Sequence, residues 1–141
     1  MSIETLQPPE WPRPKGYANG MSARGRMIFI SGQVGWDDHG RFNSDSLTEQ
    51  VKQALANIVR VLRQGRAGPQ HLVRLTWYVL SREAYLREVR EIGAAYREVL
   101  GKHFPAMSVV EVSGLIEPRA LVEIEATAVV PDEAHGDLAP A

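Results

Sequence analysis

Apolar positions recur at helical spacing in two segments of the chain. The spacing predicts one helix over residues 46–65 and a second over residues 81–101. Ser46 and Glu49 have the spacing of a capping box at the start of the first helix, and Gly65 suits its C-terminal end. The apolar stripe of this helix consists of Leu47, Val51, Leu55, Ile58 and Leu62. Both segments are long and periodic enough to be amphipathic helices that cover a core.

Five other segments have the composition or the two-residue alternation of β-strands. They span residues 17–21, 26–31, 72–80, 107–112 and 121–130. Both predicted helices follow a strand and lead into another, which favours an α+β domain with two helices packed on one face of a mixed sheet.

The last predicted strand carries an unusual mixture on the face that the helices do not cover. Leu121 and Val129 share this face with Glu123 and Glu125, because residues two apart in a strand point the same way. A face of this kind is too apolar for water and too acidic for a dry core. It therefore predicts an interface between subunits that contains a polar cleft.

Composition narrows the classes of protein that fit this pattern. The 141 residues suit a single domain over residues 15–131, with a proline-rich extended arm over residues 1–14 and a polar, flexible tail over residues 132–141. A net charge of −1 argues against nucleic-acid binding, and the lack of cysteine excludes disulfides and thiolate chemistry. No apolar run is long enough to span a membrane, and the N-terminus does not resemble a signal peptide, so we expect a soluble, cytoplasmic protein.

Two short patterns are candidates for chemistry. Glu123 and Glu125 form a carboxylate pair, in which repulsion can raise one pKa enough for general acid–base work; alternatively, both pair with arginines at a subunit edge. The run 31–35, Ser-Gly-Gln-Val-Gly, either lets the backbone approach a ligand or forms an ordinary turn. The histidines lack the spacing of metal ligands, so no metal site is expected.

Several motifs together resemble the Rid family, also called YjgF, a group of reactive-intermediate deaminases and their relatives. The matching segments are residues 16–20, 28–33, 50–62, 104–112 and 122–129. They cover nearly all of residues 15–130 in the family's order.

The resemblance implies a chorismate-mutase-like fold and a homotrimer with small-molecule clefts between subunits. It also implies cofactor-free hydrolysis of imines or enamines, such as 2-aminoacrylate, to keto acids and ammonia. By this resemblance Glu123 takes the catalytic position that orients water. The positions that line the family's cleft, and that we expect to bind substrate, are Tyr17, Ser31, Gly32, Gln33, Met107 and Val109.

The chain departs from the family's deaminases at Met107, where they have an arginine that binds the substrate carboxylate. Methionine has no charge, and losing a charge-assisted hydrogen bond of about 1.5–3 kcal/mol costs roughly ten- to over a hundredfold in affinity. Arg24, Arg26 and Arg119 are candidate replacements, although nothing in the sequence places them in the cleft.

The departure leaves open whether the protein is an enzyme. It predicts a Rid-family small-molecule-binding protein without the standard 2-imino acid deaminase activity, with hydrolysis of other imine- or enamine-type metabolites as its candidate reaction. The alternatives are an active deaminase with relocated substrate anchoring and a non-catalytic regulatory trimer. The net charge and the lack of a basic run argue against a ribonuclease.

Overall fold

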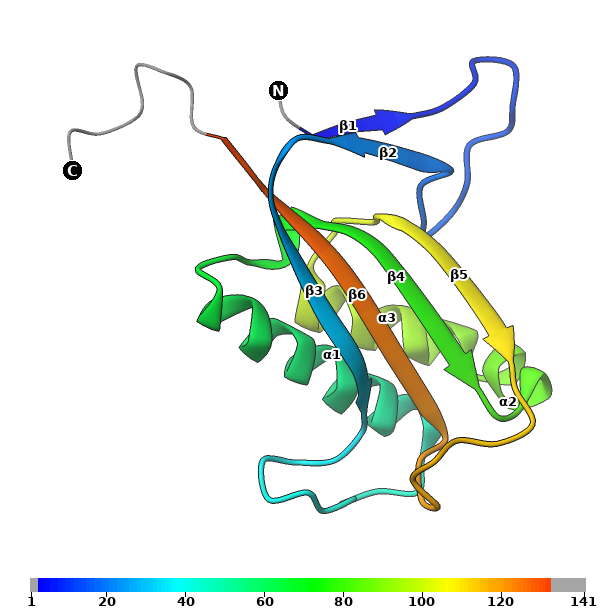
Figure 1. Ribbon diagram of the computed structural model, residues 1–141. Coiled ribbons are helices and arrows are strands. Elements are labelled where there is room, and N and C mark those ends of the chain that lie inside the picture. The colour runs from blue at the N-terminus through cyan, green and yellow to red at the C-terminus, as the bar shows by residue number, and fades with distance from the viewer. Residues whose placement is uncertain (1–2, 133–141) are drawn as a thin grey trace.

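The fold is built on a four-stranded mixed sheet, seen face-on in Figure 1. A computed structural model describes residues 3–132. The predicted tail, residues 132–141, therefore lies outside the described residues except for Asp132. The strand order is β3-β6-β4-β5, with β6 antiparallel to both neighbours and β5 parallel to β4. The four strands are β3 (Gly25–Val34), β4 (Leu72–Val79), β5 (Ala106–Glu111) and β6 (Val122–Pro131). A short 3-10 turn, η1 (Pro69–His71), leads into β4.

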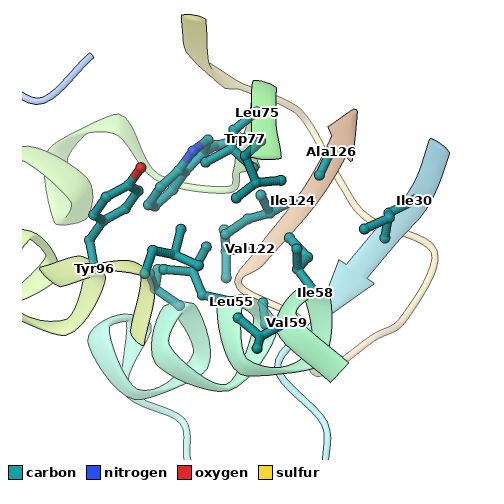
Figure 2. Packing of buried hydrophobic residues seen from close by; sticks show 14 of the residues in the cluster. Ile30, Leu55, Ile58, Val59, Leu75, Trp77, Tyr96, Val122, Ile124 and Ala126 are labelled. Carbon is teal, nitrogen blue, oxygen red and sulfur yellow. The ribbon is translucent and has the colours of Figure 1, made fainter. Parts of the chain in front are cut away.

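Two main helices pack on one face of this sheet. In Figure 1, α1 (Leu47–Gln64) and α3 (Val89–Leu100) both lie behind it, and no helix covers the front. The core fills the layer between them, with Leu55 and Ile58 of α1 packed against Ile124 of β6 (Figure 2). The predicted α+β domain, with two helices on one face of a mixed sheet, is confirmed.

The first helix begins and ends where the sequence predicts. The Ser46 hydroxyl accepts a hydrogen bond from the backbone N–H of Glu49 at 3.3 Å, which satisfies one of the free N–H groups at the helix start. At the other end, the backbone N–H of Gly65 donates to Leu62 O at 2.9 Å. The position of both ends is as predicted, but the left-handed residue at the C-terminal end is Arg66, at φ 57°, and not Gly65, at φ −91°.

The second predicted helix is interrupted, which corrects the continuous helix expected over residues 81–101. It consists of α2 (Arg82–Arg87), capped by Ser81, and α3, with Glu88 between them at φ −102° and ψ 16°. The Glu88 carboxylate accepts hydrogen bonds from Thr48 N at 3.2 Å and Thr48 Oγ1 at 2.7 Å. The break thus directs Glu88 to the N-terminus of α1, where a carboxylate is favoured by free N–H groups and the helix dipole.

Part of the N-terminal arm is a strand, which the sequence did not indicate. β1 (Ile3–Leu6) pairs antiparallel with β2 (Gly20–Ala23). β2 also begins later than the strand predicted at residues 17–21, so Tyr17 precedes it. Asn19 Nδ2 donates to Gln7 Oε1 at 2.8 Å, which ties the residue after β1 to the segment before β2.

The sheet face opposite the helices is open in the single chain. Phe29 and Met27 of β3 are 72% and 56% exposed, and Val110 of β5 is 44% exposed. Tyr78 and Trp77 point to opposite faces, as their alternation predicts: Trp77 is buried in the core and Tyr78 lies on the open face. Large apolar side chains on an uncovered face are typical of a surface that another protein copy covers.

Candidate functional site

A β-bulge places the predicted glycine of the site against the predicted catalytic carboxylate. Ile30 pairs with Ala126 and Gln33 with Ile124, so two residues of β3, Ser31 and Gly32, lie opposite one residue of β6. A β-carbon at position 32 would overlap Glu123 Oε2. The absence of a side chain at Gly32 is therefore what lets the Glu123 carboxylate lie against this backbone.

The two glutamates of β6 differ in their surroundings. Tyr78 Oη donates to Glu125 Oε1 at 2.8 Å, and this hydrogen bond, with the nearby carboxylate charges, raises the pKa of Tyr78. Glu123 makes no side-chain hydrogen bond or ion pair within residues 3–132, and it is half-buried. Within residues 3–132, neither carboxylate forms an ion pair with an arginine, so the alternative of pairing with arginines at a subunit edge stays a prediction about the assembled protein.

Ser31 and Gln33 flank Gly32 on the bulged strand. Gln33 Nε2 donates to Ser31 O at 3.1 Å, so the amide side chain folds back along the bulge. Ser31 is exposed and Gln33 is half-buried. Gln33 is in register with Ile124 and not with Glu123, so of the predicted site residues only Gly32 is shown against the Glu123 carboxylate. We call Gly32, the adjacent Ser31 and Glu123 the carboxylate group.

The other three predicted residues line a pocket between β5 and the helices. Ala18 N donates to Pro105 O at 3.0 Å, which brings the preceding Tyr17 to the start of β5. Tyr17, Met107 and Val109 all line a cavity of about 540 Å³. This volume is within the range of about 300–1,000 Å³ that is typical of small-molecule pockets. We call it the β5 pocket.

The β5 pocket has an aromatic wall. The Trp77 ring is stacked on Tyr96 with centroids 6.5 Å apart, and Tyr96 is stacked on Phe104 at 5.2 Å. Tyr85 meets Trp77 edge-on at 6.2 Å. These rings pack against the core and also line the cavity.

Two cationic residues of this pocket were not predicted from the sequence. Lys15 and Arg97 both line the cavity, and Arg97 lies one helical turn after Gly93 on α3. The available signal was Gly93, a glycine inside a helix. Glycine lowers helix stability by about 1 kcal/mol relative to alanine, so its presence indicates that the position needs space for a neighbouring group. Only the packing of α3 against β5 shows which face of the helix this pair occupies.

The predicted replacements for the missing arginine lie elsewhere in the chain. Arg26 Nη2 donates to Gly65 O at 2.8 Å, at the end of α1. Arg119 forms an ion pair with Asp45 at 2.7 Å and donates to Phe42 O at 3.1 Å. Arg24 is exposed in the turn between β2 and β3. None of the three lines the β5 pocket.

The carboxylate group and the β5 pocket lie on opposite faces of the sheet. Trp77 of β4 is in register with both Ile124 and Val109, so all three share the helix-covered face. Tyr78 is in register with Glu123, which places the glutamate on the open face. One chain therefore does not bring Glu123 together with Tyr17, Met107 and Val109.

The described residues contain neither a candidate metal centre nor a candidate membrane helix. Within residues 3–132, no group of three or more histidine, aspartate or glutamate side chains could hold a metal ion. In the same range, no helix is both long and apolar enough to cross a bilayer.

Comparison with known proteins gives consistent matches over almost the whole chain. A family model described as endoribonuclease L-PSP matches residues 12–130. A RutC family protein of Pyrococcus abyssi is 30% identical over 129 residues, which cover 91% of this chain and 98% of the relative. The human 2-iminobutanoate/2-iminopropanoate deaminase is 30% identical over 105 residues, which cover 74% of this chain and 73% of the human protein.

A comparison with solved structures also identifies a Rid-family protein. The crystal structure of YyfB from Yersinia pestis, described as a Rid-family protein of unknown function, matches with a TM-score of 0.80 and 33% identity. That match covers 92% of this chain and all of the Yersinia chain, 100%. With this fold, these motifs and the family model over residues 12–130, the chain belongs to the YjgF/RutC/Rid family.

Proposed function

We propose that this protein binds a small imine- or enamine-type metabolite and hydrolyses it without a cofactor. The observation that carries the proposal is the Glu123 carboxylate, which lies against Gly32 without a partner in the described part of the chain. A carboxylate held in this way can accept a proton from a water molecule and aim its oxygen at a C=N carbon. The human relative that is named as an imine deaminase supports the same reaction class.

The proposed reaction needs only water. Water adds to the carbon of the protonated imine, and Glu123 accepts one proton of the water during the attack, which leaves a neutral carbinolamine. Glu123 then returns this proton to the carbinolamine nitrogen, so the carboxylate is regenerated. The C–N bond breaks as the hydroxyl oxygen forms the C=O bond, and the hydroxyl proton goes to the departing ammonia, so a carbonyl compound and an ammonium ion leave.

The proposed site is completed by a second copy of the chain. The β5 pocket and the carboxylate group lie on opposite faces of one sheet, and the open face carries exposed Phe29 and Met27. In a closed oligomer, which we propose to be a trimer, the carboxylate group of one copy faces the β5 pocket of its neighbour. Tyr17, Met107 and Val109 then bind the substrate beside the neighbour's Glu123.

Because of Met107, we propose that this protein binds its substrate differently from standard 2-imino acid deaminases. A thioether cannot bind a carboxylate as an arginine fork does, so small imino acids lose their main anchor at this position. We therefore propose that the substrate is held differently, and that Met107 adds apolar contact area instead of charge.

The test is the hydrolysis rate of freshly generated 2-imino acids with wild-type protein and with Glu123→Gln. We expect Glu123→Gln to keep its fold and to lose about 10²–10⁴-fold in rate, the usual contribution of a general base. Glu125→Gln is the matched control, because glutamine can still accept the hydrogen bond from Tyr78. Full turnover in a folded Glu123→Gln protein would refute the assigned role.

Met107→Arg, measured in the same assay, reports on substrate anchoring. If the wild type accelerates hydrolysis of small imino acids, the missing arginine is compensated by other residues. If only Met107→Arg does, the hydrolytic machinery is intact and is tuned to a different substrate. If neither protein accelerates hydrolysis, the catalytic proposal is wrong, and a non-catalytic ligand-binding protein remains.

A further inference from the structure

An exposed arginine, Arg97, lies at the rim of the β5 pocket. Arg97 lies beside Gly93 on α3, where a β-carbon at position 93 would be 3.4 Å from Arg97 Nη1. The guanidinium group therefore lies alongside the bare turn of the helix at Gly93, at the edge of the cavity. It makes no ion pair with any residue between positions 3 and 132.

The charge of the pocket lining has one sign. Lys15 and Arg97 are its charged residues, and no aspartate or glutamate lines it. The two tyrosines of the aromatic wall stay neutral, because burial raises the pKa of Tyr85 and of Tyr96. A cavity with two cations and no anion favours a negatively charged ligand.

The rest of the lining is apolar and large. The aromatic wall of Trp77, Tyr85, Tyr96 and Phe104 lines part of the cavity of about 540 Å³, and aliphatic side chains line much of the rest. A three-carbon acid would leave most of this wall without contacts, and each lost contact forfeits dispersion energy. An aromatic or similarly bulky apolar group would fill the space and contact the partly exposed rings of Tyr85 and Phe104.

From these observations we infer that Arg97 is the carboxylate anchor of the β5 pocket, and that the pocket selects carboxylates with a large aromatic or apolar body. Arg97 thus supplies, from α3, the charge that Met107 does not supply from β5. Binding of the carboxylate does not depend on the proposed function. Hydrolysis of the bound ligand does rest on it. On that proposal, the substrates are 2-imino acids with bulky apolar side chains.

The inference is tested by binding, with the corresponding 2-oxo acids as probes, because these need no turnover. Calorimetric titration of the full-length protein compares phenylpyruvate with pyruvate. We expect phenylpyruvate to bind at least about tenfold more tightly, because it fills the aromatic wall. Arg97→Gln should weaken phenylpyruvate binding about ten- to a hundredfold, and Arg97→Lys by less, since lysine keeps the charge without the fork.

Arg90→Gln is the matched control, because Arg90 is an exposed arginine of the same helix that does not line the pocket. It should bind phenylpyruvate as the wild type does. Unchanged binding in Arg97→Gln, or equal affinity of the wild type for pyruvate and phenylpyruvate, would overturn the inference. Binding that depends on Arg97 without any imine hydrolysis would refute the proposed function alone, whereas hydrolysis that ignores Arg97 would refute the inference alone.

Discussion

At the scale of single residues, the site depends on what is missing at position 32 as much as on what is present at position 123. The Glu123 carboxylate occupies the space where any other residue at position 32 would place its β-carbon. The bulge formed by Ser31 and Gly32 brings that backbone toward β6. One glycine thereby determines where a carboxylate can lie.

Gly32→Ala tests this dependence. The added methyl group must displace the Glu123 carboxylate, so we expect imine hydrolysis to fall at least about tenfold while the protein stays folded. Gly114→Ala is the control, because a β-carbon at position 114 meets no atom within 4 Å. The rates are measured beside the melting temperatures of both variants, and wild-type turnover in Gly32→Ala would show that Glu123 does not need its observed position.

His71 gives a pH dependence at the same scale. Its Nδ1 accepts a hydrogen bond from Gly68 N at 3.0 Å, which requires an unprotonated Nδ1, and burial lowers the pKa of His71 below its usual 6.5. The unfolded chain therefore binds this proton more readily than the folded one. The contribution of His71 to stability is complete above about pH 6.5 and is lost as the pH falls toward the lower folded pKa.

The measurement is the free energy of unfolding in urea at about pH 7.5 and about pH 5.5. We expect the wild type to lose more stability between these values than His71→Asn, which does not titrate there. An equal loss in both proteins would mean that His71 is not a source of the pH dependence.

At the scale of elements, local signals in the sequence were sufficient for most of the fold. The cap at Ser46 and the alternation through Trp77 and Tyr78 predicted element boundaries and faces that the structure confirms. The predictions failed where a distant partner decides the conformation. Glu88 breaks a periodic helix because its carboxylate binds Thr48, 40 residues earlier in the chain. The pairing of β1 with β2 was not predicted either, because the prolines that follow β1 indicated an extended arm without a strand.

Glu88→Ala tests this account of the break. Removing the carboxylate leaves the Thr48 N–H and hydroxyl without their acceptor, so we expect a loss of about 0.5–2 kcal/mol in the free energy of unfolding, as for a lost helix cap. Glu91→Ala changes an exposed glutamate in the first turn of α3 and should cost less. Urea unfolding curves for the two variants measure the difference, and equal stabilities would contradict the capping role of Glu88.

The candidate site shows the same limit of sequence reasoning. Glu123 and Gly32 were predicted as site residues and do meet, because the strand alternation fixes the face on which Glu123 lies. Arg97 was missed because its relation to Met107 depends on how α3 packs across β5. Residues 76 positions apart, Tyr17 and Gly93, line one cavity for the same reason.

At the scale of the whole molecule, the two halves of the proposed site cannot meet within one chain. The register of β4 with its two neighbours places Glu123 and Val109 on opposite faces of the sheet. Exposed apolar side chains on the open face favour contact with another copy. Assembly would therefore create the site and bury this face at the same time.

The most direct test of a site shared between copies is to mix two inactive variants. Glu123→Gln removes the carboxylate but keeps the β5 pocket, and Gly93→Phe fills the pocket but keeps the carboxylate. After the two proteins are unfolded and refolded together in equal amounts, random assembly should restore about a quarter of the wild-type imine hydrolysis, because one site in four receives both intact halves. Hydrolysis no higher than that of the separate variants, from an oligomer that contains both chains, would contradict a shared site.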